Sequence, residues 1–213
     1  LCINSEAKIL KRFSSGLPVI YDITDQQFQG CGTERVCKDK ELIVRKSFND
    51  ENYNIKNNRV VQLGISPSGV YRNTSTYVLP ANYKYDTKGN LVSPVGSASA
   101  GFAHYGNYLY CDTKKWIDNE WIDYIIPQVY NAIDFEAACY AAIVEWWNAV
   151  VKNKKVNLYI GQGLYKKGGK LENSGSWSNI ENEWEHEMRF NQKCSNVKGF
   201  SIYCWKNYPS SRN

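Results

Sequence analysis

The sequence has few of the residues that build metal and redox sites. It contains only two histidines, His104 and His186, and they lie far apart in the chain. The seven cysteines are an odd number, and only Cys31 and Cys37 are near each other, with five residues between them. That spacing fits no common zinc pattern, and the odd count argues against a complete disulfide framework. We therefore expect no metal site.

Several longer patterns are also absent. No window approaches the run of ~18 apolar residues that a membrane-spanning helix needs. No glycine-rich phosphate loop of either common type is present, which disfavours nucleotide cofactors, and we expect no cofactor at all. The chain starts at Leu1, with no signal peptide before it. We therefore expect a processed or shortened form of a longer reading frame, whose starting point carries no targeting information.

Positive charge is present only in modest excess. The formal net charge is +5, and the lysines and arginines are scattered along the chain. The short clusters at residues 152–155 and 166–170 do not extend into a stripe. This distribution is typical of a solvated surface, and we expect no nucleic-acid partner.

Aromatic residues, in contrast, are abundant. They make up 14% of the 213 residues, with 16 tyrosines and 7 tryptophans, and the hydrophobic content of 43% is enough for a core. The length suits one domain of ordinary size or a piece of a larger one. A high tyrosine and tryptophan content favours surfaces that stack on ligands.

From residue 59 onwards, expected strands alternate with expected helices. The strands are 59–65, 122–129, 156–160 and 197–204, and the helices are 108–119, 134–151 and 179–193. Strict alternation with buried strands indicates βα units around a parallel sheet, so the fold class is α/β. Segment 74–105 is expected to be a long inserted loop, a lid or subsite wall, with a small hairpin whose tip lies at 87–90.

The N-terminal part is less regular. Residues 5–13 read as a short helix with a Ser5 cap, and residues 17–21 read as a brief strand that is a candidate fifth strand of the sheet. A loop at 26–39 and a weak helix within 40–56 follow. The last helix of the chain carries alternating glutamates at 181, 183, 185 and 187, for which we expect a solvated surface.

Polar and aromatic residues gather where the expected strands end. Successive strands are followed by Ser66 and Ser68, by Gln128 and Tyr130, by Gln162 and Tyr165, and by Tyr203 and Trp205. The carboxyl ends of parallel strands are where α/β folds bind ligands, and period-two spacing places Gln128 and Tyr130 on the same side of their strand. Amides, hydroxyls and aromatic faces suit a neutral, hydroxyl-rich ligand, and we expect a carbohydrate. The alternative, in which these side chains only satisfy backbone groups, stays open.

Three aspartates are candidate catalytic carboxyls. Asp22 and Asp25 follow the strand at 17–21, and Asp134 lies four residues past Tyr130. Each also fits an ordinary role as a turn residue or helix N-cap, Asp134 as the cap of the helix at 134–151. The Trp146-Trp147 pair of that helix is expected to pack against the sheet.

Five ordered segments resemble the glycosyl-hydrolase-like family 10 domain. They are GISPSGVYRN at 64–73, YLYCDTKKW at 108–116, WIDYIIPQVY at 121–130, LYIGQGLY at 158–165 and GFSIY at 199–203. The similarity covers roughly residues 58–208, which leaves 1–57 poorly matched and 209–213 as a tail. It implies a TIM-type (β/α) barrel, of which this chain would supply the last four or five βα units, with 1–57 as a helix–strand–helix of the same barrel. A complete barrel needs ~250 residues and eight strands, so we expect part of a longer or degenerate enzyme.

The resemblance also implies a function. The family suggests a glycoside hydrolase of the bacterial envelope, acting on a peptidoglycan strand or another surface polysaccharide, outside the cell or in the envelope. The residues expected to position the sugar are Ser66, Tyr71, Arg72, Gln128, Tyr130, Gln162, Tyr165 and Trp205, although Arg72 also fits a structural ion pair. The acidic motif DDYFYP of the family has only a faint echo in DITD at 22–25. A non-catalytic carbohydrate-binding remnant, or an unrelated α/β protein that binds another small polar ligand, therefore stays open.

Overall fold

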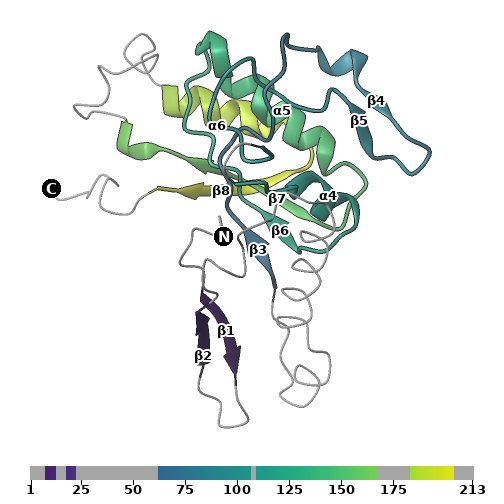
Figure 1. Ribbon diagram of the computed structural model, residues 1–213. Helices are drawn as coiled ribbons and strands as arrows, with labels where there is room; N and C mark the ends of the chain where they lie inside the picture. Colours follow the sequence, from purple (N-terminus) through teal and green to yellow (C-terminus); the bar gives the residue numbers. More distant parts are fainter. Residues whose placement is uncertain (1–7, 13–17, 23–61, 107–108, 167–182, 204–213) are drawn as a thin grey trace, which may run out of the picture.

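The computed structural model describes residues 8–12, 18–22, 62–106, 109–166 and 183–203 (Figure 1). Its centre is a four-stranded parallel sheet in the order β3-β6-β7-β8. The strands are β3 (Gly64–Ile65), β6 (Tyr124–Ile125), β7 (Asn157–Gln162) and β8 (Val197–Ile202). The predicted α/β class with a parallel sheet is confirmed, and the arrangement is consistent with part of a TIM-like fold.

Three α-helices lie within the described residues. They are α4 (Thr113–Asp118), α5 (Tyr140–Val150) and α6 (Glu183–Lys193). Figure 1 shows α5 and α6 along one side of the sheet, the arrangement that crossover connections between parallel strands produce. None of the helices described is long and apolar enough to span a membrane.

The core lies between the sheet and α5. The strand residues Ile125, Leu158 and Ile160 are fully buried, as are Trp146 and Trp147 of the helix. Each indole also has a polar partner, because Trp146 Nε1 donates to Pro94 O and Trp147 Nε1 donates to Gly69 O. The predicted packing role of the tryptophan pair is confirmed by its full burial, and its polar partners lie in the loop after β3 and the inserted segment rather than in the sheet.

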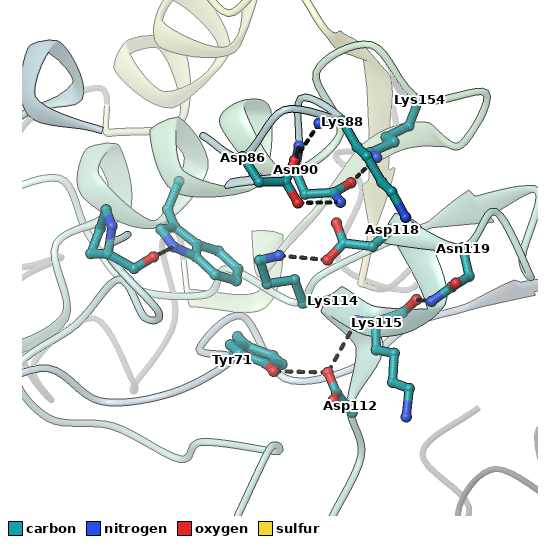
Figure 2. A network of polar contacts seen from close by, with 12 residues as sticks. Tyr71, Asp86, Lys88, Asn90, Asp112, Lys114, Lys115, Asp118, Asn119 and Lys154 are labelled. Atoms are coloured by element: carbon teal, nitrogen blue, oxygen red, sulfur yellow. Dashed lines mark hydrogen bonds and ion pairs between the residues drawn. The ribbon is translucent and has the colours of Figure 1, made fainter. Parts of the chain in front are cut away.

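The inserted segment 74–105 has its own structure. It contains a 3-10 helix, η1 (Pro80–Asn82), and a hairpin made of β4 (Lys84–Tyr85) and β5 (Leu91–Ser93). The Asp86 carboxylate accepts hydrogen bonds from the backbone N–H groups of Lys88 and Asn90 at the hairpin tip (Figure 2). The predicted hairpin tip at 87–90 is confirmed.

Helix α4 begins later than predicted. The expected start was residue 108, but the helix starts at Thr113 because Asp112 caps it, accepting from Lys115 N at 3.0 Å. Asp112 also accepts a hydrogen bond of 2.8 Å from the Tyr71 hydroxyl, and Lys114 pairs with Asp118 at 2.6 Å (Figure 2). The bond between Tyr71 and Asp112 joins the loop after β3 to the start of α4.

The predicted helix at 134–151 is shorter than expected. A 3-10 helix, η2 (Glu136–Ala138), comes first, and α5 starts only at Tyr140, after a Cys139 cap without a side-chain bond. Asp134 therefore caps no helix, and its predicted N-cap role is wrong. The sequence FEAACY allows a helix, but the carbonyl of Ala132 accepts from both Phe135 N and Tyr140 N, which closes a tight loop instead.

The helix predicted at 5–13 is wrong. Residues Lys8–Arg12 form β1, which pairs antiparallel with β2 (Pro18–Asp22) in a separate two-stranded sheet. A nine-residue helix is marginal by itself, whereas five residues between two apolar segments suit a hairpin connection. The strand predicted at 17–21 is confirmed, but it is not a fifth strand of the parallel sheet. The loop at 26–39 and the helix within 40–56 lie outside the described residues.

Candidate functional site

One face of the parallel sheet carries no helix among the described residues. Because Ile125, Leu158 and Ile160 point towards the helices, alternation places Tyr124 and Tyr159 on the opposite face. A cavity of about 340 Å³ lies on this face, lined by Gln62, Tyr124, Ile126, Tyr159, Phe200 and Ser201. We call this side of the sheet the open face. Ligand contacts are expected where it meets the carboxyl ends of the strands.

At that edge, the ends of β3 and β6 are joined through side chains. Gln128 Nε2 donates to Ser66 O at 3.0 Å and to Ser66 Oγ at 3.3 Å. The Ser66 hydroxyl in turn donates to Ile126 O at 2.9 Å. Both side chains are half-buried, and Gln128 also bridges Ser68 and Gly161 through its backbone. The structure thus brings two predicted site residues together, and their first role is to hold two strand ends in register.

Three tyrosines meet beyond the ends of β6, β7 and β8, and we call them the tyrosine cluster. Tyr130 stacks on Tyr203, with ring centroids 6.0 Å apart and planes 23° apart. Tyr165 stands edge-on to both rings, at 5.9 Å from each. The Tyr203 side chain is 58% exposed, so the cluster is open to solvent. Aromatic rings with accessible faces and phenolic hydroxyls are suited to cover and hydrogen-bond a sugar.

The backbone at Gly163 packs closely beneath the tyrosine cluster. A Cβ on Gly163 would lie 3.1 Å from ring atoms of both Tyr130 and Tyr165, so a side chain there would have to shift the rings by a few tenths of an ångström. Lys166, at the end of the 3-10 helix η3 (Leu164–Lys166), donates from Nζ to Tyr130 O. These contacts fix the position of Tyr130 relative to the end of β7.

Two predicted binding residues are buried instead. Tyr71 is 3% exposed, stacks on Trp146 at 5.2 Å, and bonds Asp112. Gln162 is fully buried on the helix side of β7, because it continues the inward alternation of Leu158 and Ile160. Neither side chain offers a surface to a ligand, so a sugar contact by either is left out of the site proposed below.

The remaining predicted residues have varied positions. Arg72 is exposed, and its guanidinium lies 5.2 Å above the Tyr105 ring, which is a cation–π contact rather than an ion pair. Asp134 is exposed in the loop after β6. Asp22 ends β2 in the separate hairpin, and Asp25 and Trp205 lie outside the described residues. Tyr203 was absent from the predicted positioning set, although its place at the end of the last strand was the signal.

Comparison with known families gives a clear match. The sequence model of the family described as glycosyl hydrolase-like 10 matches residues 43–179 of this chain. The chain belongs to the glycosyl hydrolase-like 10 family. The expected similarity to this family is confirmed, and the matched range begins earlier and ends earlier than the predicted 58–208.

Relatives in this family carry matching names. The chain is 39% identical over 140 residues to glycosyl hydrolase YngK of Bacillus subtilis, which covers 65% of this chain and 24% of the relative. It is 36% identical over 124 residues to glycosyl hydrolase DigH of Escherichia coli K12, covering 58% and 23%. The chain therefore spans about a quarter of the length of these curated relatives.

Two buried glutamates behind β7 were missed by sequence reasoning. Glu183 is 2% exposed and accepts from Ile133 N at 2.5 Å, and Glu187 is fully buried and accepts from Gln162 Nε2 at 3.3 Å. The expectation of a solvated surface is therefore wrong for these two residues, although Glu185 between them is exposed. The available signal was the i, i+4 spacing, which places Glu183 and Glu187 on one helix face.

Burial changes the protonation of this pair. Burial, reinforced by the charge of Glu183, raises the pKa of Glu187 to about 9, so Glu187 is neutral at pH 7. Burial also raises the pKa of Glu183, opposed by the Ile133 N–H. Glycoside hydrolysis ordinarily needs carboxyls that reach the glycosidic oxygen and the anomeric carbon. A pair buried on the helix side of β7 does not reach a sugar on the open face, so we assign it no catalytic role.

The described residues contain no group of three or more His, Cys, Asp and Glu side chains placed to hold a metal ion. His104, the one histidine in the core described here, is fully buried, with Nδ1 3.1 Å from Ser68 Oγ and Nε2 2.8 Å from Thr113 Oγ1. Burial lowers its pKa to about 4. His104 is thus a neutral residue that links the loop after β3 to α4.

Proposed function

We propose that this chain is the glycan-binding part of a glycoside hydrolase that acts on a bacterial cell-envelope glycan, either a peptidoglycan strand or a surface polysaccharide. The observation that carries the proposal is the tyrosine cluster, in which three rings from successive strand ends meet with centroids about 6 Å apart. Tyrosine faces cover the apolar CH face of a pyranose ring, and hydroxyl and amide groups bond its OH groups. Membership of the glycosyl hydrolase-like 10 family supports the reaction class.

In this proposal, the four parallel strands belong to a TIM-type barrel whose other strands lie in a longer protein. The length of the relatives supports this view, since the matched region is about a quarter of each of them. The open face would then be part of the barrel interior, and the carboxyl ends of the strands would form the mouth of the active site. A substrate of this kind lies outside the cell or in the envelope, and we propose that the protein acts there.

The side chains at this mouth have different tasks. Tyr130, Tyr165 and Tyr203 hold the sugar, while Ser66 and Gln128 fix the strand ends beside it. Asp134 is the candidate carboxyl of the described region, because it is exposed, follows β6 and caps no helix. The second carboxyl that hydrolysis requires is assigned to Asp22, to Asp25 or to the earlier strands of the longer protein.

Calorimetric titration with a chitin-like hexamer of N-acetylglucosamine tests the binding site. We expect Tyr130→Ala and Tyr203→Ala each to weaken binding about tenfold, because each change removes a stacking face. Tyr85→Ala is the matched control, because Tyr85 is 37% exposed but lies on the β4 hairpin under Lys152. Equal affinities for wild type and both cluster variants would exclude the tyrosine cluster as the sugar site.

The second candidate function is a non-catalytic carbohydrate-binding protein. It is favoured by the position of Glu183 and Glu187. These two neighbouring carboxyls are buried away from the open face, so they are not placed to act on a sugar there. The two candidates differ in one measurement, the release of reducing ends from peptidoglycan or a chitin-like oligomer. Binding without any release supports the second candidate, and measurable release excludes it.

A further inference from the structure

A second group of aromatic side chains is exposed near the tyrosine cluster. Tyr77, Phe102 and Phe135 are 39%, 66% and 40% exposed. The first two belong to the segment inserted after β3, and Phe135 belongs to the loop after β6. We call these three residues the aromatic seam. Exposed apolar rings that gather on adjoining loops are typical of an interaction site.

Backbone hydrogen bonds hold the two loops of the aromatic seam together. Ser99 N and Ala100 N both donate to Ala137 O, at 3.1 and 2.9 Å. The Tyr77 hydroxyl donates to Glu136 O at 2.5 Å and accepts from Cys139 N at 3.2 Å. Phe135 directly precedes Glu136, and Phe102 lies two residues past Ala100, so all three rings are within two residues of these contacts. These hydrogen bonds therefore hold in place the backbone that carries the three rings.

The same loop connects the aromatic seam to the tyrosine cluster. Tyr130 is followed by Asn131, whose amide Nδ2 donates to Ala138 O at 2.9 Å. The inserted segment is also held to the loop after β3. Val70 forms a parallel β-bridge with Ala103, and Asn73 Nδ2 donates to Gly101 O at 3.1 Å. The two aromatic groups therefore lie on consecutive loops at the carboxyl ends of β3 and β6 to β8. Tyr130 and Phe135 are five positions apart on one loop, which keeps the two groups close together.

The chemistry around the rings favours a glycan over an apolar partner. Polar side chains on the same loops are Asn73 and Ser99, which are exposed, and Asn131, which is half-buried. Each donates to a backbone carbonyl, which leaves its oxygen as an acceptor for a sugar hydroxyl. We propose that the aromatic seam binds further sugar units of the same glycan chain, so that the site takes a polymer rather than a mono- or disaccharide. This inference rests on the proposed function, and it names the length of the substrate.

Titration with N-acetylglucosamine oligomers of increasing length tests the inference. We expect the affinity of the wild type to rise from dimer to hexamer. Phe102→Ala and Phe135→Ala should each weaken hexamer binding about fivefold, because each removes one ring face, and should leave dimer binding unchanged. Leu79→Ala is the matched control, because Leu79 is 70% exposed on the same inserted segment but bears no ring. Melting curves check that the variants are folded.

Each other outcome overturns the inference in a distinguishable way. If the wild type binds dimer and hexamer equally, or if both seam variants bind the hexamer as the wild type does, the seam inference fails while the proposed function stands. A third outcome is that the wild type binds no oligomer, and that Tyr130→Ala and the wild type bind peptidoglycan with the same affinity. In that case the proposed function fails, and the seam inference fails with it. Concentration-dependent self-association that Phe102→Ala abolishes would assign the surface to a second copy of this chain.

Discussion

Glu187 is a carboxyl group whose protonation depends on the fold. Its side chain is fully buried between Gln162 and the rest of α6, and burial raises its pKa to about 9 from an ordinary value of 4.5. Two charged residues face it: Glu183 raises this pKa further, and the Lys166 ammonium lowers it. Glu187 is thus a neutral hydrogen-bonding group at pH 7.

This protonation predicts how stability changes with pH. Since the pKa of Glu187 is raised on folding, its contribution is complete below about pH 4.5 and is lost as the pH rises through about 9. We expect the free energy of unfolding to fall from pH 5 to pH 9 in the wild type. Glu187→Gln, which keeps the shape and loses the titration, should show a shallower fall. Urea unfolding at a series of pH values measures both.

The control for this change lies on the same helix. Glu185 is exposed and pairs with Arg189 at 2.5 Å, so Glu185→Gln should retain the pH dependence of the wild type. If Glu187→Gln and the wild type lose stability in parallel from pH 5 to pH 9, the group that titrates is a different one. His104 acts in the opposite direction, because its pKa is lowered to about 4 and its contribution is lost as the pH falls below about 6.5.

At the scale of elements, the loop after β3 is packed against its neighbours without space for a side chain at two glycines. A Cβ on Gly96 would lie 2.0 Å from Arg72 O, and a Cβ on Gly69 would lie 2.7 Å from Gln128 O. Both close approaches are to backbone atoms, which cannot turn away as a flexible side chain can. The inserted segment and the end of β6 are therefore held by close backbone packing.

Substitution of Gly96 tests this packing. We expect Gly96→Ala to lower the free energy of unfolding by about 2 kcal/mol or more, because the added methyl group must displace the backbone at Arg72. Gly106→Ala is the matched control, since nothing lies within 4 Å of a Cβ at that glycine. Chemical denaturation of the two variants measures the difference. Equal stability of both would show that the contact between the inserted segment and the loop after β3 is looser than described.

At the scale of the whole molecule, β3 and β8 are the edge strands of the parallel sheet in the part of the chain that the structure describes, and a cavity of about 340 Å³ lies on its open face. Among the described residues no helix covers that face, although parallel sheets are normally buried on both sides. The matched relatives are about four times longer than the matched region. Both facts support the proposal that further strands of a longer protein complete the barrel.

The catalytic assignment is tested at this scale too. If Asp134 is one of the two carboxyls, we expect Asp134→Asn to lower glycan hydrolysis about a hundredfold and to leave glycan affinity unchanged. Glu136→Gln serves as the control, because Glu136 is exposed on the same loop. Reducing-end release and calorimetric titration measure the two quantities separately. Full turnover by Asp134→Asn would move the assignment to Asp22, Asp25 or the longer protein.

The strand ends were predictable because apolar runs bounded by breakers are local signals. WIDYIIPQVY and LYIGQGLY placed Gln128, Tyr130 and Tyr165 at the ends of β6 and β7, where the structure has them. The same spacing could not predict that the Gln162 side chain is buried while those three are not. A strand has two faces, and only the position of α6 decides which face is buried. The hairpin at β1 and β2 was missed because its pairing joins two segments that are each ambiguous alone.

The sequence by itself determined the α/β class with a parallel sheet, the hairpin tip at 87–90 and the family, since each depends on local patterns and on motifs in order. Only the tertiary structure decided which polar residues are accessible. It buried Tyr71 and Gln162, withdrew Glu183 and Glu187 from solvent, and brought Tyr203 onto Tyr130. The reason is physical: burial and ring stacking depend on contacts between residues far apart in the chain, which no local spacing encodes.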